Sequence, residues 1–376
     1  MKGIKRFSVA ALGLGVAGTL ISAGMAVADP SGSPAANTRP LQGVGSDTSE
    51  EVMNALSDAV LISGQKVISS YNATGGAFQT RLSGCNYSAT GGAAPARPNG
   101  SGQGRTALLA SKNHTNGTDD CLDFARSSSV GGTTGSALTY IPFAKDAIAF
   151  AVTQASNLPK QLSLADLKAM YDCTYPGFED SDPGTAGWQS QFKALLPQAG
   201  SGSRAYFYNT ILGYADTTLA GDPNTVRGCV SDETDRSGRG GANSIQEHRT
   251  NVLDNNSIVP VSIGQYIAQS TGTSPSFIGK GVLGSFLNTA GNAVSYPIGL
   301  NTSYGTTVAG SDPVQNAPAT RDLYNVVPTS DLADPEVDSV FTGNDSLVCQ
   351  QTGVIAKYGF GLLGNACGDT TLTRAN

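Results

Sequence analysis

The sequence predicts an α/β fold with largely parallel sheets. Apolar segments typical of buried strands alternate with segments whose apolar residues have helical spacing. Tight turns rich in glycine and serine join the two kinds of segment, as in α/β architectures. The 376 residues exceed the usual length of one domain, so we expect two domains.

The N-terminus has the features of a secretory signal peptide. A basic start within residues 2–6 precedes an apolar run, and residues 26–28 (Ala-Val-Ala) form a small-residue cleavage site. Glycine and serine interrupt the run, which disfavours the alternative of a membrane anchor. We therefore expect a secreted, extracellular chain that is cleaved after Ala28, with no lipid anchor encoded near that site. Residues 29–40 are then a flexible leader.

The first expected elements are a short strand and a helix. Residues 41–45 are followed by a glycine turn, and apolar residues at 52, 56 and 59 have helical spacing. Asp47 or Thr48 can cap this helix. Residues 84–120 are rich in Gly, Asn and Pro and are expected to form a long loop.

The alternation of strands and helices continues downstream. Residues 138–152 form an extended segment that enters a buried strand, and residues 162–171 form a short helix capped by Ser163. A Gly/Ser turn precedes an amphipathic helix at residues 205–212, and the apolar strand 258–264 leads into a further helix.

The chain contains six cysteines, at positions 85, 121, 173, 229, 349 and 367. An even number in an exported chain favours disulfides, and six cysteines allow 15 pairings. A zinc site is the alternative, but the close Cys-x-x-Cys or Cys/His spacing that it needs is absent.

The charge composition excludes several function classes. The net charge is −6, and no basic stretch is visible, so we expect no binding of nucleic acid. The chain has only two histidines, His114 and His248, which limits metal sites and histidine-based catalysis. We expect no metal and no cofactor.

Four polar turns suggest a site for an oxyanion. Three of them are rich in Ser, Thr and Gly and lie near helix starts, and the fourth, residues 123–129, places an arginine beside three serines. Helix starts expose backbone N–H groups, glycine allows close approach, and hydroxyls add donors. Each turn alone is also consistent with an ordinary helix cap or loop. Together the four turns contain the parts of an oxyanion site that needs no metal.

These segments, in this order, resemble the phosphate-binding protein of bacterial phosphate ABC importers, most of all its Gly/Ser-rich secreted relatives in high-GC Gram-positive bacteria. Residues 123–128 (Asp-Phe-Ala-Arg-Ser-Ser) resemble the family's Asp-Phe-Gly-Ala-Ser-Asp strand end, and residues 200–203 (Gly-Ser-Gly-Ser) resemble its Gly-Ser-Gly-Thr phosphate loop. The other similar segments are residues 43–48, 99–104, 164–171 and 296–298, the last being the strand that returns to the first lobe.

The resemblance implies a type 2 periplasmic-binding-protein-like fold, in which two α/β lobes joined by two crossovers enclose a ligand cleft. Lobe one would comprise residues 41–142 plus 296–376, and lobe two residues 143–295. In the family, hydroxyls and backbone N–H groups of these segments donate to phosphate. The resemblance therefore implies that the ligand-binding residues are Ser46, Thr48, Ser101, Ser127, Ser201, Gly202 and Ser203. We expect a monomer, with an ABC permease as a candidate partner.

The expected lobes also favour one disulfide pattern. Pairing the cysteines in chain order keeps every disulfide within one lobe. The expected disulfides are therefore Cys85–Cys121, Cys173–Cys229 and Cys349–Cys367.

Two positions depart from the family's pattern. The family has an arginine where this chain has Pro197, and a phosphate-binding carboxylate where this chain has Ser128. Arg126 and Asp47 lie in other binding segments of the family, and we expect them to take the two roles.

Three functions remain open at this point. The first is an extracellular solute-binding protein that captures inorganic phosphate or a similar oxyanion between two lobes, for ABC import. The second is a wall or adhesion module that kept the fold without anion transport. A secreted hydrolase is the third, but the chain lacks a Gly-x-Ser-x-Gly elbow, so we expect no enzyme.

Overall fold

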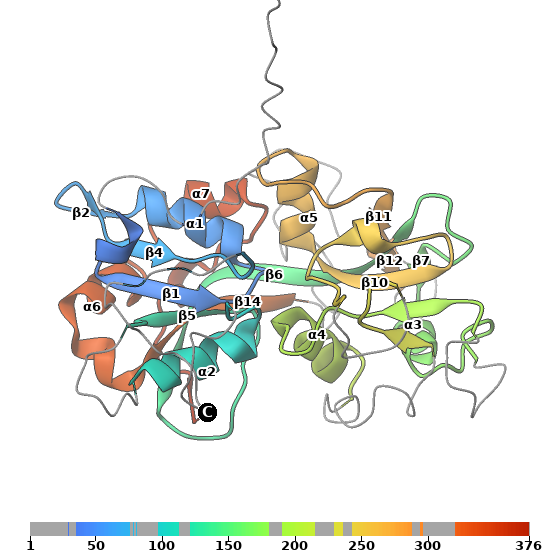
Figure 1. The fold of residues 1–376 in the computed structure, drawn as a ribbon, viewed down its shortest axis with the longest axis horizontal. Coiled ribbons are helices and arrows are strands. Elements are labelled where there is room, and N and C mark those ends of the chain that lie inside the picture. The colour runs from blue at the N-terminus through green and yellow to red at the C-terminus, as the bar shows by residue number, and fades with distance from the viewer. Residues whose placement is uncertain are drawn as a thin grey trace, which may run out of the picture.

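The computed structural model describes most of the chain after the N-terminal segment. The described residues are 29, 35–75, 78, 80, 97–112, 121–179, 190–214, 229–235, 243–287, 294–295 and 320–375. The expected signal peptide, residues 1–28, and the expected returning strand at 296–298 lie outside them. The described elements form an α/β fold whose two halves lie side by side (Figure 1).

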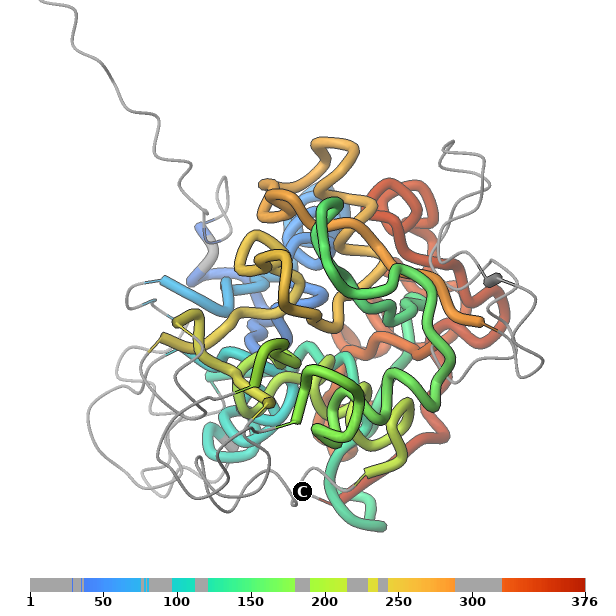
Figure 2. Tube along the Cα trace, turned by 90° about the vertical axis from the view of Figure 1, so that its right-hand side faces the viewer, coloured from blue at the N-terminus to red at the C-terminus, as the bar shows by residue number. Residues whose placement is uncertain are grey.

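We call these halves lobe one and lobe two. Lobe one contains β1 (Leu41–Gly45), α1 (Glu50–Ala59), β2 (Leu61–Ile62), β3 (Gln65–Lys66), β4 (Ile68–Ser70), α2 (Ser101–Lys112), β5 (Phe124–Ser127), α6 (Pro335–Phe341) and α7 (Thr352–Lys357). Lobe two contains β7 (Gln161–Leu162), α3 (Leu164–Tyr171), β8 (Lys193–Leu195), α4 (Gly202–Tyr206), β9 (Val230–Ser231), β10 (Ser257–Ser262), α5 (Ile263–Ser270), β11 (Gly281–Leu283), β12 (Ser285–Leu287) and β13 (Val294–Ser295). Figure 2 views the molecule from the lobe two side, with its green to orange segments in front.

Two long strands run between the lobes. They are β6 (Leu138–Thr153) and β14 (Thr320–Pro328), which pair antiparallel over the whole of β14 (Figure 1). The 16 residues of β6 are almost all buried, as expected for a strand covered on both faces. Because each lobe adds strands to this pair, one ten-stranded sheet passes through the molecule. The short β15 (Thr373–Arg374) also pairs with β6.

The two lobes repeat the same strand order. In lobe one, β4 and β5 flank β1 in parallel, and in lobe two, β9 and β10 flank β8 in parallel. The third strand of each set then pairs with an antiparallel crossing strand, β5 with β14 and β10 with β6. The α/β class with two lobes and two crossing strands is therefore confirmed, although the crossing strands are antiparallel to their neighbours.

The strand order brings the candidate loops together. In the parallel pair of β1 and β5, Gly45 lies opposite Arg126, so the residues that follow both strands leave the same edge of the sheet. Gly45 has φ +121°, and a Cβ there would lie 2.6 Å from the carbonyl oxygen of Arg126. This close approach of the backbones therefore requires glycine.

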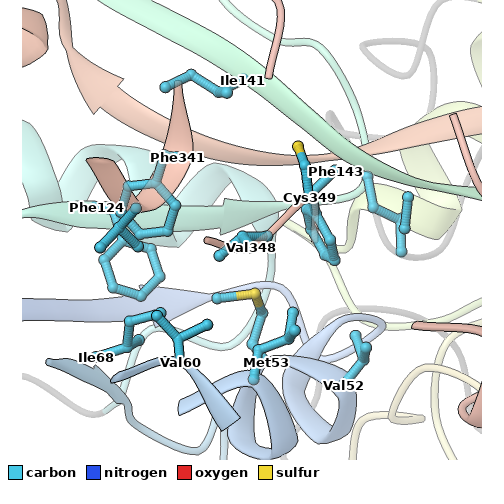
Figure 3. Packing of buried hydrophobic residues seen from close by; sticks show 14 of the residues in the cluster. Val52, Met53, Val60, Ile68, Phe124, Ile141, Phe143, Phe341, Val348 and Cys349 are labelled. Carbon is cyan, nitrogen blue, oxygen red and sulfur yellow. The ribbon is translucent and has the colours of Figure 1, made fainter. Parts of the chain in front are cut away.

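Each lobe has its own apolar core. In lobe one, Phe124 of β5 packs against Phe341 of α6 with ring centroids 5.2 Å apart, and Met53 of α1 joins the same cluster (Figure 3). In lobe two, Tyr171 of α3 packs edge-on against Phe207, which follows α4. The two clusters share no residue, so each lobe has a core of its own.

Two of the three expected disulfides are present, Cys173–Cys229 in lobe two and Cys349–Cys367 in lobe one. Cys121 is also disulfide-bonded, but its expected partner Cys85 lies outside the described residues. Both described bridges join residues within one lobe, in agreement with pairing in chain order.

Several local predictions are confirmed. The helix at 162–171 is α3, and Ser163 and Asp166 form a capping box at its start. The expected strands at 138–152 and 258–264 are β6 and β10. The helix expected at 205–212 begins three residues earlier, as α4, and continues into a π-helical turn, Phe207–Ile211.

Other local predictions are wrong. Residues 101–112, expected within a long loop, form the helix α2. Arg39, expected in a flexible leader, is fully buried and donates to the carbonyl of Ile68 at 2.9 Å. The lobe boundaries proposed from the sequence remain a prediction, since the chain between residues 295 and 320 lies outside the described residues. None of the described helices is long and apolar enough to cross a membrane.

We expect the lobe two disulfide to stabilise the fold measurably. Replacing Cys173 and Cys229 together by Ala should lower the free energy of unfolding by about 4 kcal/mol, because the unfolded chain loses the constraint on its longer loop. The matched pair Cys349→Ala and Cys367→Ala closes a shorter loop and should cost about 3 kcal/mol. Guanidinium denaturation measures both values. Unchanged unfolding midpoints in the two variants would contradict the prediction.

Candidate functional site

The two lobes meet at the polar turns identified in the sequence. The turn after β1 and the start of α2 belong to lobe one, and the turn before α4 belongs to lobe two. Gly202 of α4 lies against lobe one, since a Cβ there would lie 2.2 Å from Ser101 Oγ and 2.4 Å from Ser128 Oγ. The backbone N–H of Gly102 donates to the carbonyl of Gly200 at 3.3 Å across the same contact. The lobes are therefore closed on each other in this structure.

A first group of hydroxyls lies on the lobe one side of the contact. Ser46 Oγ donates to Ser128 Oγ at 3.0 Å, and the N–H of Ser128 donates to Ser101 Oγ at 2.9 Å. The three side chains are fully buried and bond to one another. Ser127 points elsewhere, since its hydroxyl donates to the carbonyl of Ser129.

A second group of donors surrounds the carboxylate of Glu247. The backbone N–H groups of Thr48 and Ser203 donate to it at 3.2 and 3.4 Å. The hydroxyl of Ser203 donates at 3.2 Å, the hydroxyl of Thr48 also donates, and Ser201 adds a side-chain hydrogen bond. We call Thr48, Ser201, Ser203 and Glu247 the carboxylate cluster. Its donors come from both lobes, since Thr48 belongs to lobe one and Ser203 to lobe two.

Arg321 supplies the positive charge beside the carboxylate cluster. It is the second residue of β14, and its Nη2 donates to Ser203 Oγ at 2.8 Å and to Thr48 Oγ1 at 3.5 Å. A hydroxyl that accepts from the guanidinium directs its own proton elsewhere, here to Glu247. Arg321 therefore orients the two hydroxyls as donors to an anion.

A buried ion pair fixes Arg321 in place. Its Nε and Nη2 donate to Asp146 of β6 at 3.1 and 2.8 Å, and the two residues lie opposite each other in the pairing of β14 with β6. Asp146 also accepts from the hydroxyl of Ser262 and the N–H of Gly264. Strand β6 thus holds the guanidinium directly through Asp146, and the residues around the start of α5 hold Asp146 in turn.

The surroundings keep Glu247 ionised. Burial alone would raise the pKa of its carboxyl, but the hydrogen bonds from Ser201 and Thr48 and the charge of Arg321 together lower that pKa below its usual value. A buried anion with donors on both oxygens is stable in this setting.

Asp47 lies next to the carboxylate cluster but does not cap α1. The N-cap is Ser49, without a side-chain hydrogen bond, so the cap interpretation of Asp47 is wrong. Its Oδ1 lies 3.7 Å from His248 Nε2, and its buried Oδ2 has no hydrogen-bond partner within the described part of the chain. Burial, followed by the charge of Glu247, raises the pKa of Asp47 to about 7. Burial lowers the pKa of His248 to about 4, so this imidazole is neutral at pH 7.

Arg126 does not face the carboxylate cluster. Its guanidinium donates to the carbonyls of Gly45, Ser46 and Tyr71 and to the hydroxyl of Ser70, at 2.7 to 3.2 Å. These contacts tie β1 to β4 inside lobe one. We therefore correct the expectation for the arginine of the site, because Arg321 and not Arg126 lies among its hydroxyls.

Three central residues, Asp146, Glu247 and Arg321, were not among the sequence candidates. Asp146 gave a signal, because it is a carboxylate within a mostly apolar segment that was expected to be a buried strand. Glu247 lies in a charged tripeptide, residues 247–249, in a chain with few charges. Arg321 gave none, since residues near it in the sequence have no role in the site.

The described residues contain no group of three or more His, Cys, Asp or Glu side chains that could hold a metal ion. A cavity of about 410 Å³ opens beside the carboxylate cluster, and its lining includes Ser128, Lys145, Tyr206, Arg321 and Asp322. Arg321 links this cavity to the carboxylate cluster, because it lines the cavity and donates to the hydroxyls of Thr48 and Ser203.

No family model and no curated protein sequence matches the chain. An ABC-type phosphate transport receptor from Vibrio cholerae is 12% identical, with 86% of this chain and 99% of that chain covered and a TM-score of 0.46. The phosphate-binding protein from Stenotrophomonas maltophilia is 12% identical, with 87% of this chain and 91% of that chain covered and a TM-score of 0.43. A peroxide-bound OxyR mutant from Corynebacterium glutamicum is 11% identical, with 86% of this chain and 67% of that chain covered and a TM-score of 0.42. Likenesses this distant leave the ligand and the partners of this chain open.

Asp47 should make stability depend on pH. The folded chain keeps its proton up to about pH 7, whereas the unfolded chain releases it near 3.8. Folding takes up a proton between these values, so the contribution of Asp47 to stability falls as the pH rises through this window. The stability of Asp47→Asn relative to wild type should therefore rise by up to about 1.4 kcal/mol per pH unit there.

Chemical denaturation at several pH values between about 4 and 7 measures this difference. Asp58→Asn is the control, because Asp58 is exposed and pairs with Lys66 at the surface of lobe one. A difference between Asp47→Asn and wild type that stays constant with pH would show that Asp47 ionises normally.

Proposed function

We propose that the chain is an exported solute-binding protein that captures a small oxyanion, inorganic phosphate in the first place, between its two lobes. The observation that carries the proposal is the convergence of two N–H groups and two hydroxyls on one buried carboxylate, with Arg321 behind the hydroxyls. A carboxylate is itself an oxyanion, so a donor set that binds it also suits the oxygens of phosphate.

The origin of the donors supports capture between lobes. Thr48 comes from lobe one, Ser203 comes from lobe two, and Arg321 lies on a crossing strand. An anion bound to all three would hold the lobes together, and the long strands β6 and β14 would act as the hinge. The acidic chain offers little long-range attraction, so affinity would depend on these short-range donors.

Asp47 supports phosphate over sulfate. At neutral pH phosphate carries a proton that it can donate to a carboxylate, whereas sulfate has none. With its pKa raised to about 7, Asp47 is ionised in part of the population at neutral pH. In that form its Oδ2, which has no hydrogen-bond partner within the described residues, can accept the proton of phosphate.

A second function is favoured by a different observation. Glu247 already takes the donors that a free anion would need. A wall or adhesion module that kept the fold and lost the ligand would have this arrangement.

Delivery to an ABC permease, by contrast, is supported only by the sequence resemblance. A hydrolase has less support, because a pKa lowered to about 4 makes His248 a weak general base, and its Nδ1 has no hydrogen-bond partner within the described residues to orient the ring.

Direct titration separates the first two functions. Purified mature protein titrated with phosphate at pH 7 should give saturable heat, and phosphate at about one hundred times its Kd should raise the unfolding free energy by about 2.7 kcal/mol. The rise appears as a higher melting temperature. Absence of both heat and stabilisation with phosphate and with sulfate would favour the adhesion module.

The choice between anions should depend on Asp47. In Asp47→Asn the new amide can donate, so sulfate should gain on phosphate by at least about tenfold, or about 1.4 kcal/mol. Competitive titration of the wild type and the variant with both anions measures the ratio of affinities. An identical ratio in the two proteins would remove Asp47 from ligand selection.

A further inference from the structure

Glu247 is held by lobe two and reaches lobe one. Its segment is fixed to lobe two by two backbone hydrogen bonds, from Ile245 N–H to the carbonyl of Asp232 at 2.7 Å and from Gln198 N–H to the carbonyl of Ile245 at 2.8 Å. The carboxylate nevertheless accepts from the N–H and the hydroxyl of Thr48 in lobe one. A single side chain thus joins the two lobes through the donors of the proposed anion site.

The carboxylate has the bonding pattern of a ligand. Its Oε2 accepts from Thr48 and from the Ser203 hydroxyl, and its Oε1 accepts from the Ser203 N–H. The side chain of Glu247 is fully buried. Arg321 donates to the Ser203 hydroxyl, which in turn donates to Glu247. Charges buried to this extent persist only where hydrogen bonds and opposite charge compensate the loss of water.

The remaining charges around the cluster give Glu247 no direct ion-pair partner within the described residues. Arg321 is paired with Asp146, and Asp47 lies beside His248. Within the described residues Glu247 makes no hydrogen bond with Arg321 itself; the two are linked by the shared hydroxyls and by the attraction of their charges. The carboxylate therefore uses the same neutral donors that a free oxyanion would use, and the two cannot occupy them together.

We propose that Glu247 is a tethered ligand of the oxyanion site, which keeps the lobes closed without free anion and must leave before phosphate can bind. The proposal rests on the proposed function. The tethered carboxylate competes with free anion for the same donors. The apparent affinity for phosphate is therefore the intrinsic affinity multiplied by the fraction of molecules in which Glu247 has left the site.

The test compares Glu247→Ala with wild type and with Gln246→Ala. Gln246 is a matched control, because its side chain also crosses between the lobes, accepting from Asn99 Nδ2, but leaves the carboxylate cluster intact. Each protein is titrated with phosphate at pH 7, and small-angle scattering gives its radius of gyration without ligand. Glu247→Gln is a second variant of nearly the same shape, and it replaces the alanine variant if that protein does not fold.

Removal of the tethered carboxylate should strengthen binding and open the lobes. We expect Glu247→Ala to bind phosphate at least about tenfold more tightly than wild type and to have a larger radius of gyration without ligand. Acetate, a free carboxylate, should then bind the variant and return its radius of gyration to the wild-type value, while leaving the wild type unchanged. Gln246→Ala should show none of these changes.

Other outcomes would overturn the proposal or its basis separately. Phosphate affinity in Glu247→Ala equal to or weaker than that of wild type, or an equal gain in Gln246→Ala, would overturn the tethered ligand while the proposed function stands. If neither wild type nor Glu247→Ala binds phosphate or sulfate, but acetate compacts Glu247→Ala, the proposed function fails and the tethered carboxylate stands. No response to any of the three anions would overturn both.

Discussion

The buried ion pair between Arg321 and Asp146 lies where the two crossing strands pair, and the donors of the site are arranged around it. The two residues are opposite each other in the antiparallel register, so the pairing of β14 with β6 is also what places the guanidinium. Asp146 accepts from Nε and Nη2, while Nη1 donates to the carbonyl of Ser128 in lobe one and Nη2 also donates to the hydroxyl of Ser203 in lobe two. Loss of one partner from such a pair typically costs about 3 to 5 kcal/mol, because the other charge is left buried and unpaired.

The ion pair also explains why the site can favour an anion in an acidic protein. Asp146 balances the charge of Arg321, so the attraction for an anion comes mainly from oriented hydroxyls and N–H groups and not from a net positive charge. Such dipoles are effective where water is scarce, and Thr48, Ser203 and Glu247 are all buried. Glu247 makes this arrangement stable in the closed state, since otherwise buried donors would be left without acceptors.

Much of the fold follows from local sequence patterns. The capping box at Ser163 and Asp166, the apolar run of β6 and the glycine turn after β1 each depend on neighbouring residues, and each was predicted. The helix α2 was not predicted, because Ser101–Lys112 begins with glycines and serine that are typical of loops. Packing overrides this weak propensity, since Leu108 of α2 is buried in an apolar cluster with Val44 of β1 and Ala125 of β5.

The sequence by itself determined the α/β class and the turns that supply the hydroxyls, because periodicity, capping and glycine turns act over a few residues. The two lobes were expected only from the family resemblance. Only the tertiary structure decided which charges face those hydroxyls. Arg126 adjoins the serines in the sequence, yet its donors are directed to carbonyls of lobe one. Arg321 and Glu247 reach the site from other parts of the chain, through the pairing of β14 with β6 and through the segment held against Gln198. The direction of a buried charge depends on strand register and lobe contact, which join residues more than a hundred positions apart.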